Sequence, residues 1–354
     1  MSEVVSMSFR ILEPMMFRGP GEFDPYVRGT YSRATTLAMP SPSTIAGVLA
    51  TYCISVLGVP APSSGDWLER YHAVLGNDVR IKGPLIKFNG KIMAEDRLLN
   101  GFLEMGKVKQ KCEIEYKKLA NKHNLLEKLS EYLSEKKEEF KPSIKLRKDV
   151  RIGVGLEIRG DVPMKSVKEG FLYTAEYIDY MRITSEKPKE TSVEIVAEIR
   201  GKLVENLPSI RALPVKLGGE GRIALLSFQS GEKILEEIKK FWKDQERYQG
   251  LLALYLATPA LFKGGKRVKE YVKNWVEHIN CRFMGISGES TVLGAGFMID
   301  EKKRKPIYTS LHPGSIIFVE GNLNLLEIYQ DKPLGEASTL GYGTILPIPI
   351  TPIN

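Results

Sequence analysis

Three glycines lie close together near the end of the chain, in residues 335–344. Gly335, Gly341 and Gly343 are suited to positive φ angles and to close approach of a ligand to the backbone. Successive amide groups in such a loop form a concave site for phosphate. Tyr342, between two of the glycines, offers a ring on which a base could stack. The alternative is a tight turn into the apolar run at residues 345–350, whose prolines favour an edge strand.

A second glycine-rich stretch lies near the middle of the chain. It contains Gly218, Gly219, Gly221 and Arg222 and runs directly into an apolar segment at residues 223–228. Both glycine stretches are therefore followed by a short predicted strand. Two loops of this kind favour a chain built from two related halves, although the similarity between them is weak.

The segment at residues 13–34 is rich in Gly, Pro, Arg and Tyr and has no helical period. A loop of this length within a compact domain is usually functional or disordered. Arginines interleaved with aromatic rings suit phosphate contact combined with base stacking. The alternative is a surface loop with scattered charges. The candidate residues for RNA contact in this segment are Arg18, Arg28 and Arg33.

Apolar residues recur at helical spacing over residues 42–57 and predict a helix that ends near Gly58. Ser41 stands at the N-cap position, with Pro42 after it. Ser43 and Thr44 add hydroxyl groups at the start of the helix, where free amides and the helix dipole favour phosphate. The apolar stripe itself is expected to face the core.

Residues 141–151 are basic with little acid, and Lys145, Arg147 and Lys148 lie within them. We interpret this stretch as a hairpin or arm that contacts the RNA backbone. The alternative is a surface that only improves solubility.

Catalytic chemistry has little support in the sequence. RNA cleavage without a metal needs a positioned acid and base, usually histidine. The four histidines, His72, His123, His278 and His312, do not pair at short spacing, and no cluster has the spacing of a metal site. We therefore expect no catalytic residues, no metal and no cofactor.

Composition sets the outer limits. The chain has 354 residues, enough for two domains, and 43% of them are hydrophobic. A formal net charge of +8 favours nucleic acid or another polyanion as partner. Three widely spaced cysteines indicate a reduced cytoplasmic protein. We also expect no signal peptide, membrane span or membrane partner.

The remaining pattern predicts alternating strands and helices. A strand is expected at residues 5–11, and Asn89-Gly90 indicates a hairpin. The other predicted helices cover residues 113–140, 232–243 and 266–278. The predicted strands of the later part cover residues 193–203, 250–262, 283–287, 292–299, 314–320 and 323–329. This order is typical of an α+β fold with a mixed domain used twice.

Several of these stretches together resemble the RAMP (repeat-associated mysterious protein) superfamily of CRISPR systems. More narrowly, the chain is similar to the third RAMP subunits of Cmr complexes, the type III-B effectors. The resemblance covers most of the chain except residues 99–150. It is carried by LEPMMFRGPGEFDPY, PSPSTIAGVLAT, GPLIKFNGK, EGFLYTAEYI, KLGGEGRIA, LYLATPALF, PGSIIFVEG and GEASTLGYGT.

The resemblance implies two tandem ferredoxin-like domains, each with a glycine-rich loop. The expected boundaries are 1–245, with an insertion at about 99–150, and 246–354. It further implies a non-catalytic subunit that grips the 5′ tag of the guide RNA in antiviral defence. The implied partners are the large polymerase-like (cyclase-type) subunit and the RAMP backbone subunits.

Carried onto this chain, the resemblance selects residues from both glycine loops and from the N-terminal segment, which would face either RNA or the large subunit. They are Gly218, Gly219, Gly221, Arg222, Gly335, Gly341, Tyr342, Gly343, Arg18, Gly19, Arg28, Arg33, Ser41, Ser43 and Thr44. Two alternatives stay open. One is a metal-independent RAMP endoribonuclease that processes precursor guide RNA, since fold alone does not determine function. The other is a structural subunit without RNA contacts.

Overall fold

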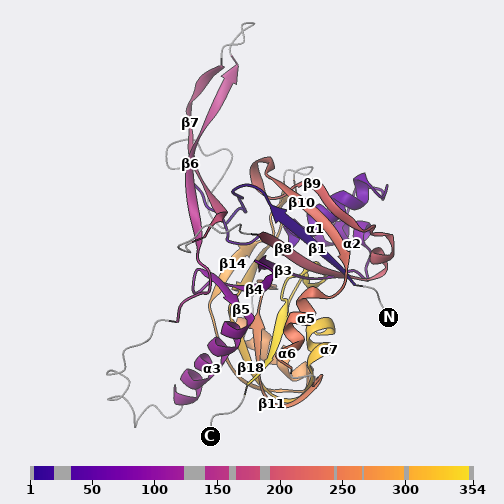
Figure 1. Ribbon diagram of the computed structural model, residues 1–354, viewed down its shortest axis with the longest axis vertical. Coiled ribbons are helices and arrows are strands. Elements are labelled where there is room, and N and C mark those ends of the chain that lie inside the picture. Colours follow the sequence, from indigo (N-terminus) through magenta and orange to yellow (C-terminus); the bar gives the residue numbers. More distant parts are fainter. Residues whose placement is uncertain are drawn as a thin grey trace, which may run out of the picture.

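Two antiparallel sheets form the frame of the protein, shown in a computed structural model (Figure 1). The structure describes residues 4–19, 33–122, 140–158, 165–183, 192–242, 245–264, 267–298 and 303–350. The expected α+β class is confirmed. None of the helices in these ranges combines the length and apolar character needed to cross a lipid bilayer.

The first half, up to residue 242, contributes the larger sheet and a long hairpin. Its elements are β1 (Val5–Ile11), β2 (Arg33–Ala34), α1 (Pro42–Ser55), α2 (Trp67–Leu75), β3 (Arg80–Phe88), β4 (Lys91–Asp96), β5 (Gly101–Glu104), α3 (Met105–Lys122), β6 (Leu146–Ile158), β7 (Lys165–Ile183), β8 (Val193–Arg200), β9 (Ile210–Lys216), β10 (Ile223–Ser230) and α5 (Lys233–Lys239), with short 3-10 turns η1 (Lys202–Asn206) and η2 (Gly219–Gly221).

The second half begins at residue 245. Its elements are β11 (Arg247–Leu256), β12 (Ala260–Phe262), α6 (Val268–His278), β13 (Arg282–Ser287), β14 (Ser290–Gly294), β15 (Phe297–Met298), β16 (Lys303–Arg304), β17 (Ile307–Leu311), β18 (Ile316–Asn324), α7 (Leu325–Asp331) and β19 (Ile345–Pro349), with the 3-10 turn η3 (Ser338–Leu340) before the last strand.

The two sheets share one strand order. In the seven-stranded sheet the central strands run β3-β8-β1-β10, and the four-stranded sheet runs β13-β18-β11-β19. When only these four strands of each sheet are numbered in chain order, both sheets have the order 2-3-1-4. Helices lie between the first and second of these strands in both halves: α1 and α2 between β1 and β3, and α6 between β11 and β13. β19 is an edge strand, as its prolines predict.

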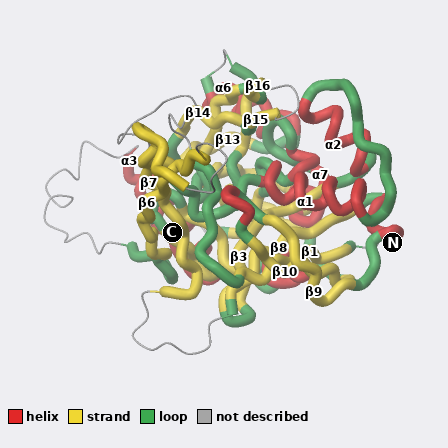
Figure 2. Tube along the Cα trace, turned by 90° about the horizontal axis from the view of Figure 1, so that it is seen from above, coloured by secondary structure: helices red, strands yellow, loops and turns green. Residues whose placement is uncertain are grey.

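The hairpin β6–β7 projects from the body of the molecule (Figure 1). Seen from above, this hairpin and the helices α1 and α2 lie on opposite sides (Figure 2). β7 pairs in parallel with β2, where Arg33 lies opposite Thr174. Residues 146–151 of the basic arm expected at residues 141–151 are thus the start of β6, and residues 141–145 precede it.

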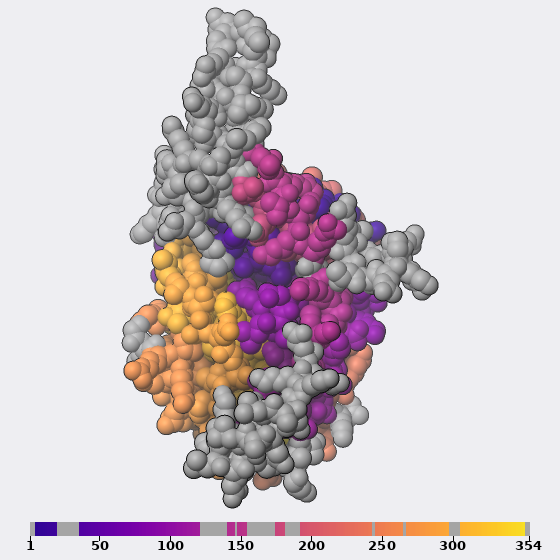
Figure 3. All heavy atoms as spheres, turned by 90° about the vertical axis from the view of Figure 1, so that its left-hand side faces the viewer, coloured from indigo at the N-terminus to yellow at the C-terminus, as the bar shows by residue number. Residues whose placement is uncertain are grey.

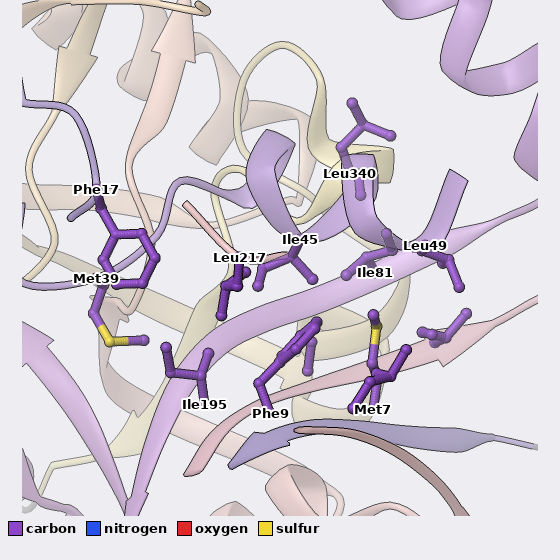
Figure 4. Packing of buried hydrophobic residues seen from close by; sticks show 14 of the residues in the cluster. Met7, Phe9, Phe17, Met39, Ile45, Leu49, Ile81, Ile195, Leu217 and Leu340 are labelled. Atoms are coloured by element: carbon purple, nitrogen blue, oxygen red, sulfur yellow. The ribbon is translucent and has the colours of Figure 1, made fainter. Parts of the chain in front are cut away.

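Each of the two hydrophobic cores contains residues from both halves. Leu340 and Tyr342 pack in the core formed by β1, β8 and α1, and Leu340 lies close to Ile45 and Ile81 (Figure 4). Leu85 and Val196 in turn belong to the core of the four-stranded sheet. In the space-filling view, atoms of the first half lie directly against those of the second (Figure 3).

Several local predictions were wrong, among them the strand expected at residues 292–299, which is two strands, β14 and β15. Residues 323–329 end β18 and then form α7, because the Asn324 side chain accepts hydrogen bonds from the amides of Leu326 and Glu327 and caps a helix. The strand predicted at residues 250–262 is two strands, β11 and β12. The helix predicted from residue 113 already begins at Met105, and residues 123–139 of that prediction lie outside the described ranges.

Candidate nucleic-acid interface

The first glycine loop joins β9 to β10 and rests on the segment that follows β1. Gly218 has a φ of +80°, and a Cβ there would lie 2.5 Å from the carbonyl oxygen of Met16. The amide of Gly219 donates to the same oxygen at 2.8 Å. Gly221 also has positive φ, but apart from its chain neighbours no described residue has an atom within 4 Å of the Cβ position. Gly218 is therefore required for packing, whereas Gly221 leaves its backbone open.

Arg222 lies directly after this loop and is held by two residues. Its Nη1 donates to the Glu13 carboxylate at 2.5 Å, and its guanidinium carbon lies 4.8 Å from the centroid of the Tyr177 ring. The other Glu13 oxygen accepts from the amide of Ile223 at 2.9 Å. That backbone bond, followed by the bond from Arg222, lowers the pKa of Glu13. Tyr177 OH donates to Glu220.

The base of the β6–β7 hairpin reaches the same place. The Arg151 guanidinium carbon lies 4.9 Å from the Tyr177 ring centroid, and Arg151 Nε donates to Asp149 at 3.1 Å. Lys148 forms a salt bridge with Glu176 at 3.0 Å. Each of these cations thus faces a carboxylate, so the arm carries less uncompensated charge than its basic sequence suggests. Lys145 and Arg147 also lie at the surface.

The segment after β1 pairs with β7 and so lies beside the first glycine loop and the base of the hairpin. Met15 exchanges backbone hydrogen bonds with Ile178 of β7 at 2.9 and 2.7 Å. The Arg18 side chain is exposed, and the Arg18 backbone forms an isolated β-bridge with Thr36. The amide of Gly19 donates to the carbonyl oxygen of Thr35. We call the residues at this junction the first glycine-loop surface: Glu13, Arg18, Gly19, Lys148, Arg151, Tyr177, Gly218–Arg222 and β2 with Arg33. Arg28 lies outside the described residues.

The second glycine loop lies elsewhere, and the expectation that Tyr342 presents its ring to a base was wrong. The Tyr342 side chain is 1% exposed and belongs to the first core. Gly335, Gly341 and Gly343 all have positive φ, and a Cβ on any of them would overlap a backbone carbonyl oxygen. For Gly341 that oxygen belongs to Gly83 of β3. These glycines allow backbone to pack against backbone, and Gly341 and Gly343 are buried rather than open to a ligand.

The start of α1 is covered by the same loop. Ser43 Oγ and Tyr342 OH form a hydrogen bond of 3.0 Å, and Tyr71 OH donates to the carbonyl of Ser43 at 3.0 Å. Burial raises the pKa of Tyr342, and it raises that of Tyr71 to about 12. Ser41 Oγ bonds Ser43 and Thr44 rather than capping the helix. The predicted phosphate site at Ser43 is therefore occupied by protein, and Ser41 and Thr44 are only partly exposed.

The described histidines each contact a different neighbour. His72 Nε2 lies 3.0 Å from Thr339 Oγ1, and His312 Nδ1 lies 3.1 Å from Arg97 Nη1. Burial lowers the pKa of both rings. His278 Nδ1 lies 2.6 Å from the Asn274 carbonyl oxygen, and His123 is outside the described ranges. Among the residues described, no three or more His, Cys, Asp and Glu side chains group as metal ligands would.

Sequence reasoning did not select four members of the first glycine-loop surface: Glu13, Arg151, Tyr177 and Glu220. Glu13 begins the segment at residues 13–34 and Arg151 ends the basic run, so both stood inside predicted stretches. Nothing local marks Tyr177 as the ring that two arginines contact, because its partners come from β6 and from the β9–β10 turn.

Comparison with known proteins decides the family. Residues 93–350 match the sequence pattern of the family described as CRISPR-associated protein (Cas_Cmr3). The chain belongs to this family. It is also 27% identical over 350 residues to the CRISPR system CMR subunit Cmr3 of Saccharolobus solfataricus, with 95% of this chain and 93% of that protein covered.

Two solved structures have similar folds. A chain of the type III-B Cmr-beta complex bound to cognate target RNA matches with a TM-score of 0.58 and 23% identity, over 96% of both chains. A chain of the same kind of complex bound to cognate target RNA and AMPPnP matches with a TM-score of 0.56 and 23% identity, over 88% of this chain and 86% of the other. At this identity the likeness concerns the fold, which extends over most of this Cas_Cmr3 family chain.

Proposed function

We propose that the protein is a non-catalytic, RNA-binding subunit of a type III-B CRISPR effector complex. In this role it grips the 5′ tag of the guide RNA and docks the large polymerase-like subunit, beside the RAMP backbone subunits. The observation that carries the proposal is membership of the Cas_Cmr3 family over residues 93–350. The S. solfataricus relative is named as a CMR subunit, and the similar solved chains come from Cmr complexes bound to target RNA.

The first glycine-loop surface is the proposed contact with the tag. It combines Arg222, which follows the loop, with two cations of β6, Lys148 and Arg151, and with the exposed backbone of Gly221. Such groups bind phosphate oxygens and set the position of the RNA. The exposed side chains of Arg18, Lys145 and Arg147 extend the same surface.

We further propose that the two sheets are the cores of two ferredoxin-like domains divided near residue 245. Their common order of 2-3-1-4 supports this assignment. In each half a helix connects the first two strands, α1 with α2 in the first and α6 in the second. Residues 99–150 then hold β5 and α3, which join the body, and the start of the projecting hairpin.

The contacts of His72 and His312 favour a scaffold over an endoribonuclease. Each ring nitrogen described above bonds a neighbour from another part of the chain, Thr339 or Arg97. A general acid or base for RNA cleavage must instead reach the reacting 2′-hydroxyl or leaving oxygen. Incubation with repeat-containing RNA tests this point. Cleavage products that disappear in His72→Ala or His312→Ala would establish the endoribonuclease in place of the scaffold.

The experiment that tests the proposal is RNA binding by the protein, alone and with the large subunit. Guide RNA with its own 5′ tag is compared with a scrambled tag over a series of salt concentrations. We expect preference for the true tag and recovery of intact RNA. Arg18→Ala and Arg147→Ala should each weaken binding and reduce the salt slope by about 1. Lys269→Ala, which removes an exposed charge from α6, is the matched control.

Two results would contradict the proposal. Equal affinity for both tags with the large subunit present would leave only a generic basic surface. Unchanged affinity in the two arginine variants, with the same slope as Lys269→Ala, would favour a structural subunit whose RNA contacts lie elsewhere in the complex.

A further inference from the structure

Arg222 uses only part of its hydrogen-bonding capacity. A guanidinium carries five N–H donors in a planar fork. Nη1 bonds Glu13, whereas Nε is buried and has no hydrogen-bond partner among the described residues. A buried donor without a partner is costly. The arginine is therefore held in place with one buried donor, Nε, unsatisfied.

The carboxylate that holds Arg222 is itself accessible. The Glu13 side chain is 33% exposed and that of Arg222 is 20% exposed. Ion pairs with this degree of exposure contribute little net stability. Glu13 also keeps an independent partner, because its other oxygen accepts from the backbone amide of Ile223 at 2.9 Å. Loss of the contact to Arg222 would therefore leave Glu13 hydrated and still hydrogen-bonded.

The backbone beside this pair is open to a ligand. Gly218 and Gly219 fasten one end of the loop to Met16, whereas Gly221 has no described atom within 4 Å of its Cβ position. An anion that approaches on this side would meet the exposed backbone of Gly221. Fixed loop geometry with a free approach is what a phosphate site of this kind needs.

We propose that Arg222 is a phosphate-binding residue of the RNA site and that Glu13 is its internal counter-anion, displaced when RNA binds. This inference rests on the proposed function. Carboxylate and phosphate both offer two oxygens to the guanidinium fork, so one can replace the other on Arg222. While the site is empty, Glu13 keeps the arginine stacked on Tyr177 and reduces its attraction for other anions. Glu13 therefore has two opposing effects: it lowers the affinity for RNA, and it holds Arg222 in the position in which it can bind phosphate.

The test is a double-mutant cycle with Glu13→Gln and Arg222→Ala, measured as affinity for 5′-tagged guide RNA with the large subunit present. Glu13→Gln removes an internal competitor whose interaction free energy with Arg222 is about that of an exposed ion pair. We therefore expect this variant to bind RNA roughly two- to fivefold more tightly. In the Arg222→Ala background the same change should have at most the small effect of removing one negative charge from the surface. A coupling of this kind isolates the Glu13–Arg222 contact from other consequences of each change.

Two further variants separate the contact from general charge. Asp149→Asn removes one negative charge from the same surface but pairs with Arg151, so its effect should be equal with and without Arg222. Glu13→Asp keeps the charge but shortens the side chain, and we expect it to raise affinity as Glu13→Gln does. The urea midpoint of each variant verifies that it is folded.

The inference is overturned if Glu13→Gln changes affinity by the same factor in both backgrounds, or if it lowers affinity. Failure of the proposed function gives a different result, since the unmodified protein would then show no preference for the true tag. A protein that prefers the tag but shows no coupling in the cycle refutes only the role of Glu13.

Discussion

Two glycines of similar conformation, one in each loop, should respond very differently to the same substitution. Gly221 has a φ of +67° and Gly341 a φ of +102°, so alanine at either site adopts a backbone conformation that costs about 1–2 kcal/mol. The surroundings differ. A Cβ on Gly221 meets no described atom within 4 Å, whereas a Cβ on Gly341 overlaps the carbonyl oxygen of Gly83 and approaches Ile81 at 3.5 Å.

The extra cost at Gly341 follows from this overlap. The atom that must move belongs to the backbone of β3, inside a close-packed core, and forced overpacking of cores typically costs about 1–3 kcal/mol. We therefore expect Gly221→Ala to destabilise the protein by about 1 kcal/mol and Gly341→Ala by about 3 kcal/mol. The difference, about 2 kcal/mol, measures the contact between the second glycine loop and the first sheet.

Urea denaturation followed by tryptophan fluorescence measures both variants. Trp67 lies in the first core and Trp242 in the second, so the signal reports on both halves. Guide-RNA affinity of the folded variants gives the second measurement: Gly221→Ala should weaken binding and Gly341→Ala should leave it unchanged. Equal destabilisation by the two changes, or loss of RNA affinity in folded Gly341→Ala, would refute the division into an open and a buried loop.

Three further predictions concern the contacts between the halves. Tyr342→Phe should cost about 1 kcal/mol in urea denaturation, through loss of the bond to Ser43, and should add nothing further in a Ser43→Ala background. Lys111→Met should cost about 3–5 kcal/mol because it leaves the fully buried Asp96 carboxylate without its 2.5 Å partner, and Asp96→Asn in the same chain should restore part of the loss. Burial lowers the pKa of Lys82 from 10.5 to about 8. Between these two pH values the unfolded chain therefore binds more protons than the folded protein, so the free energy of unfolding rises with pH by on the order of 3 kcal/mol. Lys82→Met should remove this rise, which is measured as the urea midpoint from pH 7 to 10.5.

Local signals were sufficient for elements whose backbone is specified nearby. The alternation at Val5–Ile11 gave β1, and Asn89-Gly90 gave the β3–β4 hairpin, where both residues have positive φ. Short apolar runs were less informative. The apolar pattern of residues 323–329 is compatible with a strand or a helix. The side chain of Asn324, which caps the following turn, decides for a helix. The helix α2 was missed although a local signal for it was present, since Asp66 and Glu69 form a capping box at its start.

The candidate site could be predicted only in part, because glycine has two uses that look alike in sequence. A positive φ without a side chain admits either a ligand or another stretch of backbone. Gly221 faces open space and Gly341 faces β3, and the choice depends on the sheet each loop meets. For Tyr342 the decisive partner, Ser43, lies 299 residues earlier. No local pattern carries that information.

The sharing of cores between the halves has a consequence for the order of synthesis. Leu340 and Tyr342 complete the core around β1 and α1, although the strands of that sheet are all made by residue 230. A growing chain thus exposes part of the apolar surface of its first half while more than a hundred further residues are translated, which at about 5–20 residues per second lasts several seconds or more. Domains usually fold in turn as they leave the ribosome. Here the first core is complete only after the second glycine loop has been made, so this interval is when the chain is most exposed to aggregation and to protein quality control.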